Sequence, residues 1–188
     1  IATKTRRFVD ALEGLRMRTF LTSAQLARNV NLNASINIPL DLDGDDELDT
    51  ILVWEAYRSA PDNPNKDVAD AWRDWDVAGS GGWWSTKVLP DGWPDGHTGS
   101  NCAANPQDCT FSLDAFQDKY PDAVILGPGR EPPNVNTGPL GQEYPGGITI
   151  VTGSTSNGGW ANFEGYVDDV RESEGDGKKT LTLILRYG

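Results

Sequence analysis

The chain has 188 residues, the length of one ordinary domain, and a chain of this size can bury about 70% of the surface that it exposes when unfolded. Its 16 Lys and Arg residues against 28 Asp and Glu residues give a net charge of -12. That charge repels the phosphates of DNA and RNA and the headgroups of anionic lipids, so we exclude nucleic acids and membrane surfaces as partners. No stretch approaches the roughly 20 apolar residues that cross a bilayer, so we expect no membrane insertion.

Alternation of apolar and polar residues predicts β-strands along most of the chain. Residues 15–21 and 36–42 repeat with a period of two, residues 51–57 are β-branched or aromatic on both faces as in a central strand, and residues 71–77 alternate again. Four later segments have the same character: 123–126, 147–151, 163–170 and 180–187. The 21 Gly and 12 Pro residues lie largely in the joints between these segments, which argues against long helices. The sequence therefore predicts an all-β fold of about eight strands.

One segment, SLDAFQDKY over residues 112–120, has the pattern of a short helix. Ser112 can cap its first turn, Leu113, Phe116 and Tyr120 form an apolar stripe, and Pro121 ends it. Residues 23–31 are ambiguous, because they fit either a helical turn or a loop.

Both cysteines lie in the short stretch CAANPQDC. Cys102 and Cys109 suit a small disulfide-closed loop, which forms in an oxidising compartment and predicts an extracellular or cell-surface location. The alternative is two unrelated free thiols. A zinc site is not expected, because His97 is the only histidine and the spacing is not that of a zinc knuckle.

An Asp-rich stretch, DLDGDDELD over residues 41–49, is the strongest candidate for an ion site. Hard cations such as Ca²⁺ take six to eight oxygen ligands, and closely spaced carboxylates around a Gly turn supply several of them. We therefore predict a calcium site whose ligands are Asp41, Asp43, Asp45 and Asp49. The alternative is a plain hairpin turn with solvated acids.

The seven Trp residues raise the question of a sugar-binding platform. Exposed indoles stack on pyranose rings, and Trp83, Trp84 and Trp93 lie near Gly-rich loops where such a ligand-binding face could form. Large aromatics in sheet proteins also fill cores, so the two interpretations stay open.

Catalysis is not expected. Glycosidases need two carboxylates across a cleft, and no paired motif singles out Glu55, Glu143 or Glu164 among the many acids. The chain has no nucleophile elbow and no phosphate-binding glycine loop.

The order of several short segments resembles a known group of proteins. The segments are LEGLRMRTFLTS, a strand ending in DLDGDDELDT, ILVWEAY, WRDWDV followed by WWSTKVLPDG, a Cys-bounded loop, a short helix before PDAVILG, and GGWANFEGYVDDV. Together they are similar to exported bacterial surface proteins with jelly-roll, concanavalin A-like domains. The resemblance implies one jelly-roll-type antiparallel β-sandwich over residues 1–188, with one short helix, and it implies export more than any activity.

The resemblance has one departure at its start. Members of the group have further strands ahead of the segment matching LEGLRMRTFL, whereas here only IATKTRRFVDA precedes it. A missing strand would leave an open sheet edge, which a neighbouring copy or another protein could complete by β-strand addition. Alternatively, residues 3–8 are themselves the edge strand, or the chain is trimmed. We therefore expect a non-catalytic structural protein of the cell surface that assembles into a filament or array, with a carbohydrate-binding module as the alternative.

Overall fold

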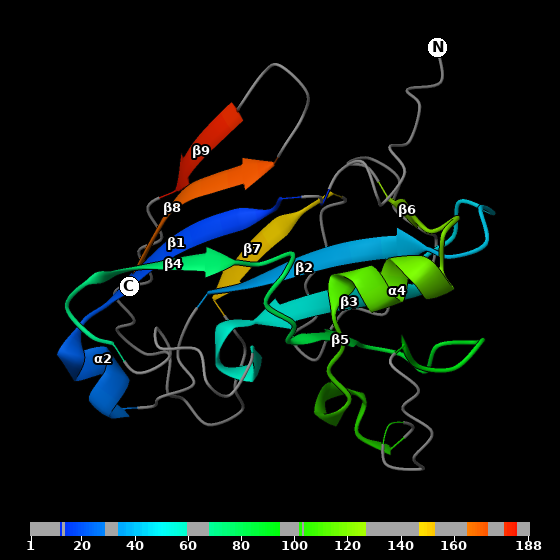
Figure 1. The fold of residues 1–188 in the computed structure, drawn as a ribbon, viewed down its shortest axis with the longest axis horizontal. Helices are drawn as coiled ribbons and strands as arrows, with labels where there is room; N and C mark the ends of the chain where they lie inside the picture. The colour runs from blue at the N-terminus through cyan, green and yellow to red at the C-terminus, as the bar shows by residue number, and fades with distance from the viewer. Residues whose placement is uncertain are drawn as a thin grey trace.

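The computed structural model describes residues 12, 14–28, 34–59, 68–94, 102, 104–126, 147–152, 165–172 and 179–183. At residue 28 and from residue 151 onward it describes the backbone alone. Within these ranges the chain forms antiparallel strands in two sheets, together with short helices (Figure 1).

The first sheet has four strands in the order β4-β1-β8-β9, which are β4 (Trp72–Asp76), β1 (Arg16–Leu21), β8 (Gly165–Glu172) and β9 (Lys179–Leu183). β1 pairs antiparallel with β4 on one side, from Arg16 opposite Asp76 to Phe20 opposite Trp72. On its other side β1 pairs with β8, where the register shifts between Arg16 and Arg18. In Figure 1 the four strands follow one another across the sheet. β4 therefore lies at one end of this row of described strands.

The second sheet is built around β2 (Ala34–Asp41), which is buried at all eight positions. Its order is β5-β3-β2-β6, with β7 also paired to β2, and the further strands are β3 (Thr50–Glu55), β5 (Trp83–Ser85), β6 (Val124–Ile125) and β7 (Thr149–Thr152). β2 has neighbours along both edges, and its residues are buried on both faces, as in a central strand.

β6 and β7 occupy one edge of β2 in succession. β6 pairs with the end of β2, from Leu40 to Asp41, and β7 pairs with its start, from Ala34 to Asn37. The N–H of Gly147 donates to the carbonyl of Leu126 at 2.6 Å, so the start of β7 lies next to the end of β6. The two strands together act as one interrupted strand.

Side chains from both sheets form one hydrophobic cluster. Met17 and Trp75 come from the first sheet, and Ile36, Leu52 and Trp54 come from the second. The rings of Trp54 and Trp75 meet edge to face with 5.7 Å between their centroids, a favourable aromatic geometry. The indole N–H of Trp75 also donates to the Thr19 hydroxyl at 2.8 Å, so its polar atom is satisfied inside the core.

Two α-helices and two 3-10 turns complete the described elements: α2 (Ser23–Arg28), α4 (Leu113–Lys119), η1 (Ala56–Arg58) and η3 (Pro106–Asp108). The helix expected at residues 112–120 is confirmed as α4. Its cap is Ser112, whose hydroxyl accepts the Ala115 N–H, and Leu113 and Phe116 are buried. The ambiguous segment after β1 forms the helical turn α2.

The all-β prediction is confirmed for the described residues, and each of the eight expected strands corresponds to an observed one. β5 was not expected, because residues 83–85 read as part of a Gly-rich loop. The expected strands at 163–170 and 180–187 are described only in part, as β8 and β9. The N-terminal segment 3–8, one candidate for an edge strand, lies outside the described residues.

The contact between Trp54 and Trp75 predicts a large loss of stability when one ring is removed. Trp75→Ala should lower the free energy of unfolding by about 3–5 kcal/mol, because it leaves a cavity in the shared core. Trp72→Ala is the matched control: Trp72 lies on the same strand but is 40% exposed, so its loss should cost less than about 1 kcal/mol. Urea unfolding followed by circular dichroism measures both, and equal losses would contradict this account.

Candidate metal centre

The Asp-rich stretch forms the loop that joins β2 to β3. The hairpin closes with Leu40 opposite Thr50, and the N–H of Asp49 donates to the Leu40 carbonyl at 3.0 Å. Gly44 and Asp46 have positive φ angles of 83° and 67°. Nothing lies within 4 Å of a Cβ built on Gly44, so the turn needs glycine there for its backbone conformation and not for space.

Asp41 is the organising residue of this loop. Its side chain is fully buried, and its two carboxylate oxygens accept three backbone N–H groups of the loop. Oδ1 accepts from Asp43 at 3.2 Å and from Gly44 at 2.6 Å, and Oδ2 accepts from Asp46 at 2.8 Å. Hydrogen bonds to an ionised acceptor are stronger than neutral ones, so the loop folds around the Asp41 carboxylate.

The other carboxylates of the loop accept backbone N–H groups in the same way. Asp49 accepts from Leu42 at 2.6 Å, Asp43 accepts from Asp45 at 3.2 Å, and Asp45 accepts from Glu47 at 2.8 Å. The acidic side chains of the loop therefore hold its backbone in place.

Three of these carboxylates converge. One oxygen each from Asp41, Asp43 and Asp49 lies within 4.8 Å of the other two, with Asp41 buried, Asp43 exposed and Asp49 half-buried. This acidic triad could hold a metal ion. Asp45, the fourth ligand expected from the sequence, is exposed and lies outside the triad. The spacing of the acids in the sequence therefore predicted the right loop for the candidate metal site. The turn at Gly44 determines which of its carboxylates converge.

Electrostatic repulsion within the loop acts on Asp43. The N–H of Asp45, which donates to its carboxylate, lowers the pKa of Asp43. Partial desolvation and the negative charges of Asp45, Asp49 and Asp41 together outweigh that hydrogen bond, and the pKa of Asp43 is raised above its ordinary value of 3.8. A pKa that neighbouring negative charges raise is lowered again when a cation binds beside the carboxylate.

The three Trp residues considered for a sugar platform lie mainly inside the protein. Trp83 is fully buried and its indole N–H donates to the Val77 carbonyl at 2.9 Å, and Trp93 is only 8% exposed. Trp84 is half-buried and its indole N–H donates to Glu55 at 2.9 Å. This burial favours the core interpretation, while ligand binding by these residues stays an untested prediction.

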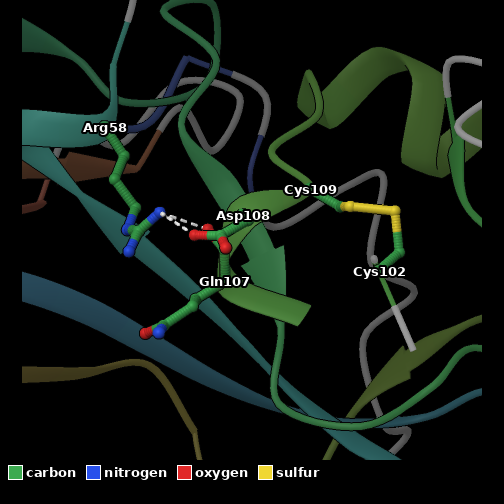
Figure 2. The surroundings of a disulfide bond; sticks show 5 residues. All are labelled: Arg58, Cys102, Gln107, Asp108 and Cys109. Atoms are coloured by element: carbon green, nitrogen blue, oxygen red, sulfur yellow. Dashed lines mark hydrogen bonds and ion pairs between the residues drawn. A yellow bond between two sulfur atoms is a disulfide. The ribbon is translucent and has the colours of Figure 1, made fainter. Parts of the chain in front are cut away.

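The cysteines form a disulfide between Cys102 and Cys109, with 5.5 Å between their Cα atoms. Two free thiols are thereby ruled out. Figure 2 shows how the same loop is tied to η1, the turn that follows β3: the Arg58 guanidinium donates to the Gln107 carbonyl and lies 3.7 Å from the Asp108 carboxylate. A disulfide and an ion pair therefore fix this loop from two sides.

Arg58 also joins a small polar cluster that the sequence did not reveal. Its Nε lies 2.9 Å from Glu55 Oε2, the same oxygen that accepts from Trp84, and 2.8 Å from the Tyr57 hydroxyl. Desolvation, reinforced by the charge of Glu55, raises the pKa of Tyr57. The Glu55 carboxylate thus accepts hydrogen bonds from both Arg58 and Trp84. Glu143, Glu164 and His97 lie outside the described residues.

Comparisons with protein-family models, with curated proteins and with solved structures find no match to this chain. Among the residues that the structure describes, no helix is long and apolar enough to cross a membrane.

The disulfide predicts a measurable part of the stability. The variant Cys102→Ser/Cys109→Ser should lose about 2.5 kcal/mol of unfolding free energy, because the bond restricts a short loop in the unfolded chain. Thermal and urea unfolding of the oxidised protein and of the variant measure the difference. An unchanged free energy of unfolding would contradict a structural role for the bond.

The triad predicts opposite effects of two similar substitutions in metal-free protein. Asp41→Asn should destabilise the fold by about 1–3 kcal/mol, because three backbone donors lose an ionised acceptor. Asp43→Asn should stabilise it at neutral pH, because it removes repulsion from the neighbouring carboxylates. Chemical unfolding in the presence of EDTA compares the two variants.

The raised pKa of Asp43 also fixes the pH dependence of that gain. A carboxyl group whose pKa is higher in the folded state favours folding while it is protonated, and this contribution is lost as the pH rises through the folded-state pKa. Asp43→Asn should therefore match the original protein below pH 3.8 and exceed its stability above the raised pKa. A difference that is constant with pH would contradict the assignment.

Proposed function

We propose that this chain is a non-catalytic, exported β-sandwich domain that serves as a structural unit at a cell surface, and that Ca²⁺ bound by Asp41, Asp43 and Asp49 holds its β2–β3 hairpin. The observation that carries the proposal is the convergence of these three carboxylates around a fully buried aspartate, with one oxygen of each within 4.8 Å of the others. Like charges so placed repel one another unless a cation lies between them.

The chemistry of the triad favours a hard cation. All three side-chain donors are carboxylate oxygens, and the residues of the triad include neither a histidine nor a cysteine that would favour zinc or copper. Calcium accepts irregular geometry and fills its remaining positions with backbone carbonyls and water, whereas Mg²⁺ demands a near-ideal octahedron and gives up water reluctantly. Three acids on one hairpin, which leave the remaining coordination positions to backbone carbonyls and water, suit calcium better.

The structural role is supported by how the protein is held together. A single hydrophobic cluster takes side chains from both sheets, which is the arrangement expected of a sandwich of the jelly-roll type. A disulfide between buried cysteines is typical of proteins that fold in an oxidising compartment. A calcium ion at the hairpin would add a third constraint of the kind that extracellular domains use.

Such a domain should be stabilised by calcium without performing a reaction. At a free Ca²⁺ concentration of about 100 times the dissociation constant, the free energy of unfolding should rise by about 2.7 kcal/mol. Isothermal titration calorimetry gives the affinity and stoichiometry, and differential scanning calorimetry with and without EDTA gives the shift in melting temperature. We expect one site per chain, with a weaker response to Mg²⁺.

Matched variants locate the site. Asp49→Asn should weaken calcium binding at least tenfold, because it removes one of three charged ligands. Asp118→Asn on α4 makes the same chemical change on an exposed acid outside the loop and should leave the affinity unchanged. Asp45→Asn tests whether the ion has three or four carboxylate ligands: an unchanged calcium affinity indicates three, and a weakened affinity indicates four. A titration that shows neither heat nor a change in melting temperature would sink the calcium proposal.

A further inference from the structure

The first sheet turns a patterned surface away from the core along β1 and β4. Met17, Thr19 and Leu21 of β1 are buried, as are Arg73 and Trp75 of β4, so the alternate residues of both strands point outward. Residues directly opposite each other on paired strands share a face of the sheet. The register of the two strands therefore defines an outer surface of six side chains, called here the β1–β4 face: Arg16, Arg18, Phe20, Trp72, Asp74 and Asp76.

Trp72 is the anchor of the β1–β4 face. It is the most exposed aromatic residue in the part of the chain that the structure describes, with 40% of its surface accessible. Its ring is held in place from two directions: the Phe20 ring meets it edge to face with 5.8 Å between the centroids, and the Arg18 guanidinium lies 5.3 Å from its centroid. A large side chain that is exposed and already ordered loses little conformational freedom when a partner covers it. Trp and Arg are also the residue types that most often dominate the binding energy of protein interfaces.

The four charged residues of the face balance one another. Each acid on β4 lies opposite a base on β1, and Arg18 Nε lies 2.9 Å from the Asp74 carboxylate. The whole chain, in contrast, carries a net charge of -12. Two copies of such a chain repel each other in most orientations, so they meet most easily through a surface without net charge.

The arrangement of these charges is also complementary to itself. Within the face, acids occupy only β4 and bases occupy only β1. A two-fold axis that runs along the strands, midway between β1 and β4, lays β4 of one copy over β1 of the other. Each Asp then faces an Arg of the partner, as Asp74 faces the partner's Arg18, and Trp72 faces the partner's Phe20. A two-fold axis across the strands would instead lay β4 over β4 and bring the acids of two copies together.

We propose that the β1–β4 face binds the same face of a second copy of this chain, in a symmetric dimer whose two-fold axis runs along these strands. The inference rests on the structural role proposed above and names the partner for it. Sheets that pack face to face lie about 10 Å apart with their strands within about 30° of each other, a separation that Arg and Trp side chains fill from both sides. Phe20 and Asp74 already make contacts inside their own chain, and the partner's side chains add to these.

The chemistry of the face favours a second copy over a highly charged partner. The face combines aromatic and Arg side chains with no Lys or Glu, a composition typical of protein–protein contacts, and both of its Asp residues lie opposite an Arg. A polyanion would meet the two acids and a polycation would meet the two bases. Neither therefore gains net attraction from the face, whereas a second copy pairs every charge with its opposite.

Two charge variants test the proposed pairing. Arg18→Asp and Asp74→Arg each place like charges across the dimer contact, so each variant alone should be monomeric. In an equimolar mixture acid again faces base at both positions, and a heterodimer should form. Both substitutions break the ion pair within their own chain, so only contact between chains explains recovery on mixing. Each changes the net charge of -12 by only two units, so both chains stay acidic and have no general attraction for each other.

Analytical ultracentrifugation of the full chain measures the association. The unmodified protein should dimerise with a dissociation constant on the order of tens of micromolar, because the contact is small. Trp72→Ala should weaken dimerisation at least tenfold, because it removes the anchor of the face. Val88→Ala removes an exposed apolar side chain elsewhere, and Asp118→Arg on α4 makes the same charge change as Asp74→Arg. Neither control should weaken dimerisation.

The inference fails if the folded, unmodified chain stays monomeric at every concentration, if the mixed charge variants stay monomeric, or if Trp72→Ala dimerises as well as the unmodified protein. A monomeric chain that binds a soluble neutral oligosaccharide, such as cellohexaose, through Trp72 would also overturn it and assign the face to a glycan. Circular dichroism establishes first that each variant is folded. Calcium titration of the same samples keeps the two proposals separate, because the triad lies on a hairpin of the other sheet and can bind or fail to bind calcium whether or not the chains associate.

Discussion

The burial of β2 is the constraint on which the rest of the structure depends. A strand buried at all eight positions must satisfy every backbone group through neighbours on both edges, and β3, β6 and β7 supply them. Its last residue is Asp41, a carboxylate with no exposed surface. A buried charge is tolerated only when it is hydrogen-bonded, so the loop after β2 turns its own N–H groups toward that carboxylate. The hairpin geometry follows from this one requirement.

The same requirement explains why a metal site would arise here. The turns at Gly44 and Asp46 that bring loop N–H groups onto Asp41 also bring Asp43 and Asp49 beside it. The hydrogen bonds shape the loop, while desolvation and repulsion from the neighbouring carboxylates raise the pKa of Asp43 and disfavour its charged form. A bound cation would therefore find its ligands already in position and would gain mainly by removing repulsion. Such preorganisation favours affinity over any large rearrangement.

Local patterns in the sequence predicted the elements that local physics determines. The spacing of Leu113, Phe116 and Tyr120, with Ser112 before them, was sufficient for α4, and two-residue alternation was sufficient for β1 and β4. β5 was not predicted, because three residues between glycines and polar residues are too few to show a two-residue repeat. Only their pairing with β3 makes them a strand. The meeting of Asp41, Asp43 and Asp49 without Asp45 likewise depends on positive φ angles that the sequence does not display. The cluster of Glu55, Arg58 and Trp84 joins separate strands and loops, so it required tertiary structure.

The two sheets protect their outer described strands by different means. The outer side of β5 is covered: Trp83 and Phe111 exchange backbone hydrogen bonds, and the disulfide loop lies next to Phe111 in the chain. β4 instead carries Asp74 and Asp76 at its rim, and acidic side chains discourage pairing with another copy of the same edge. A covered strand edge cannot pair with any further strand, whereas an edge lined by carboxylates discourages pairing only with acidic or apolar strands.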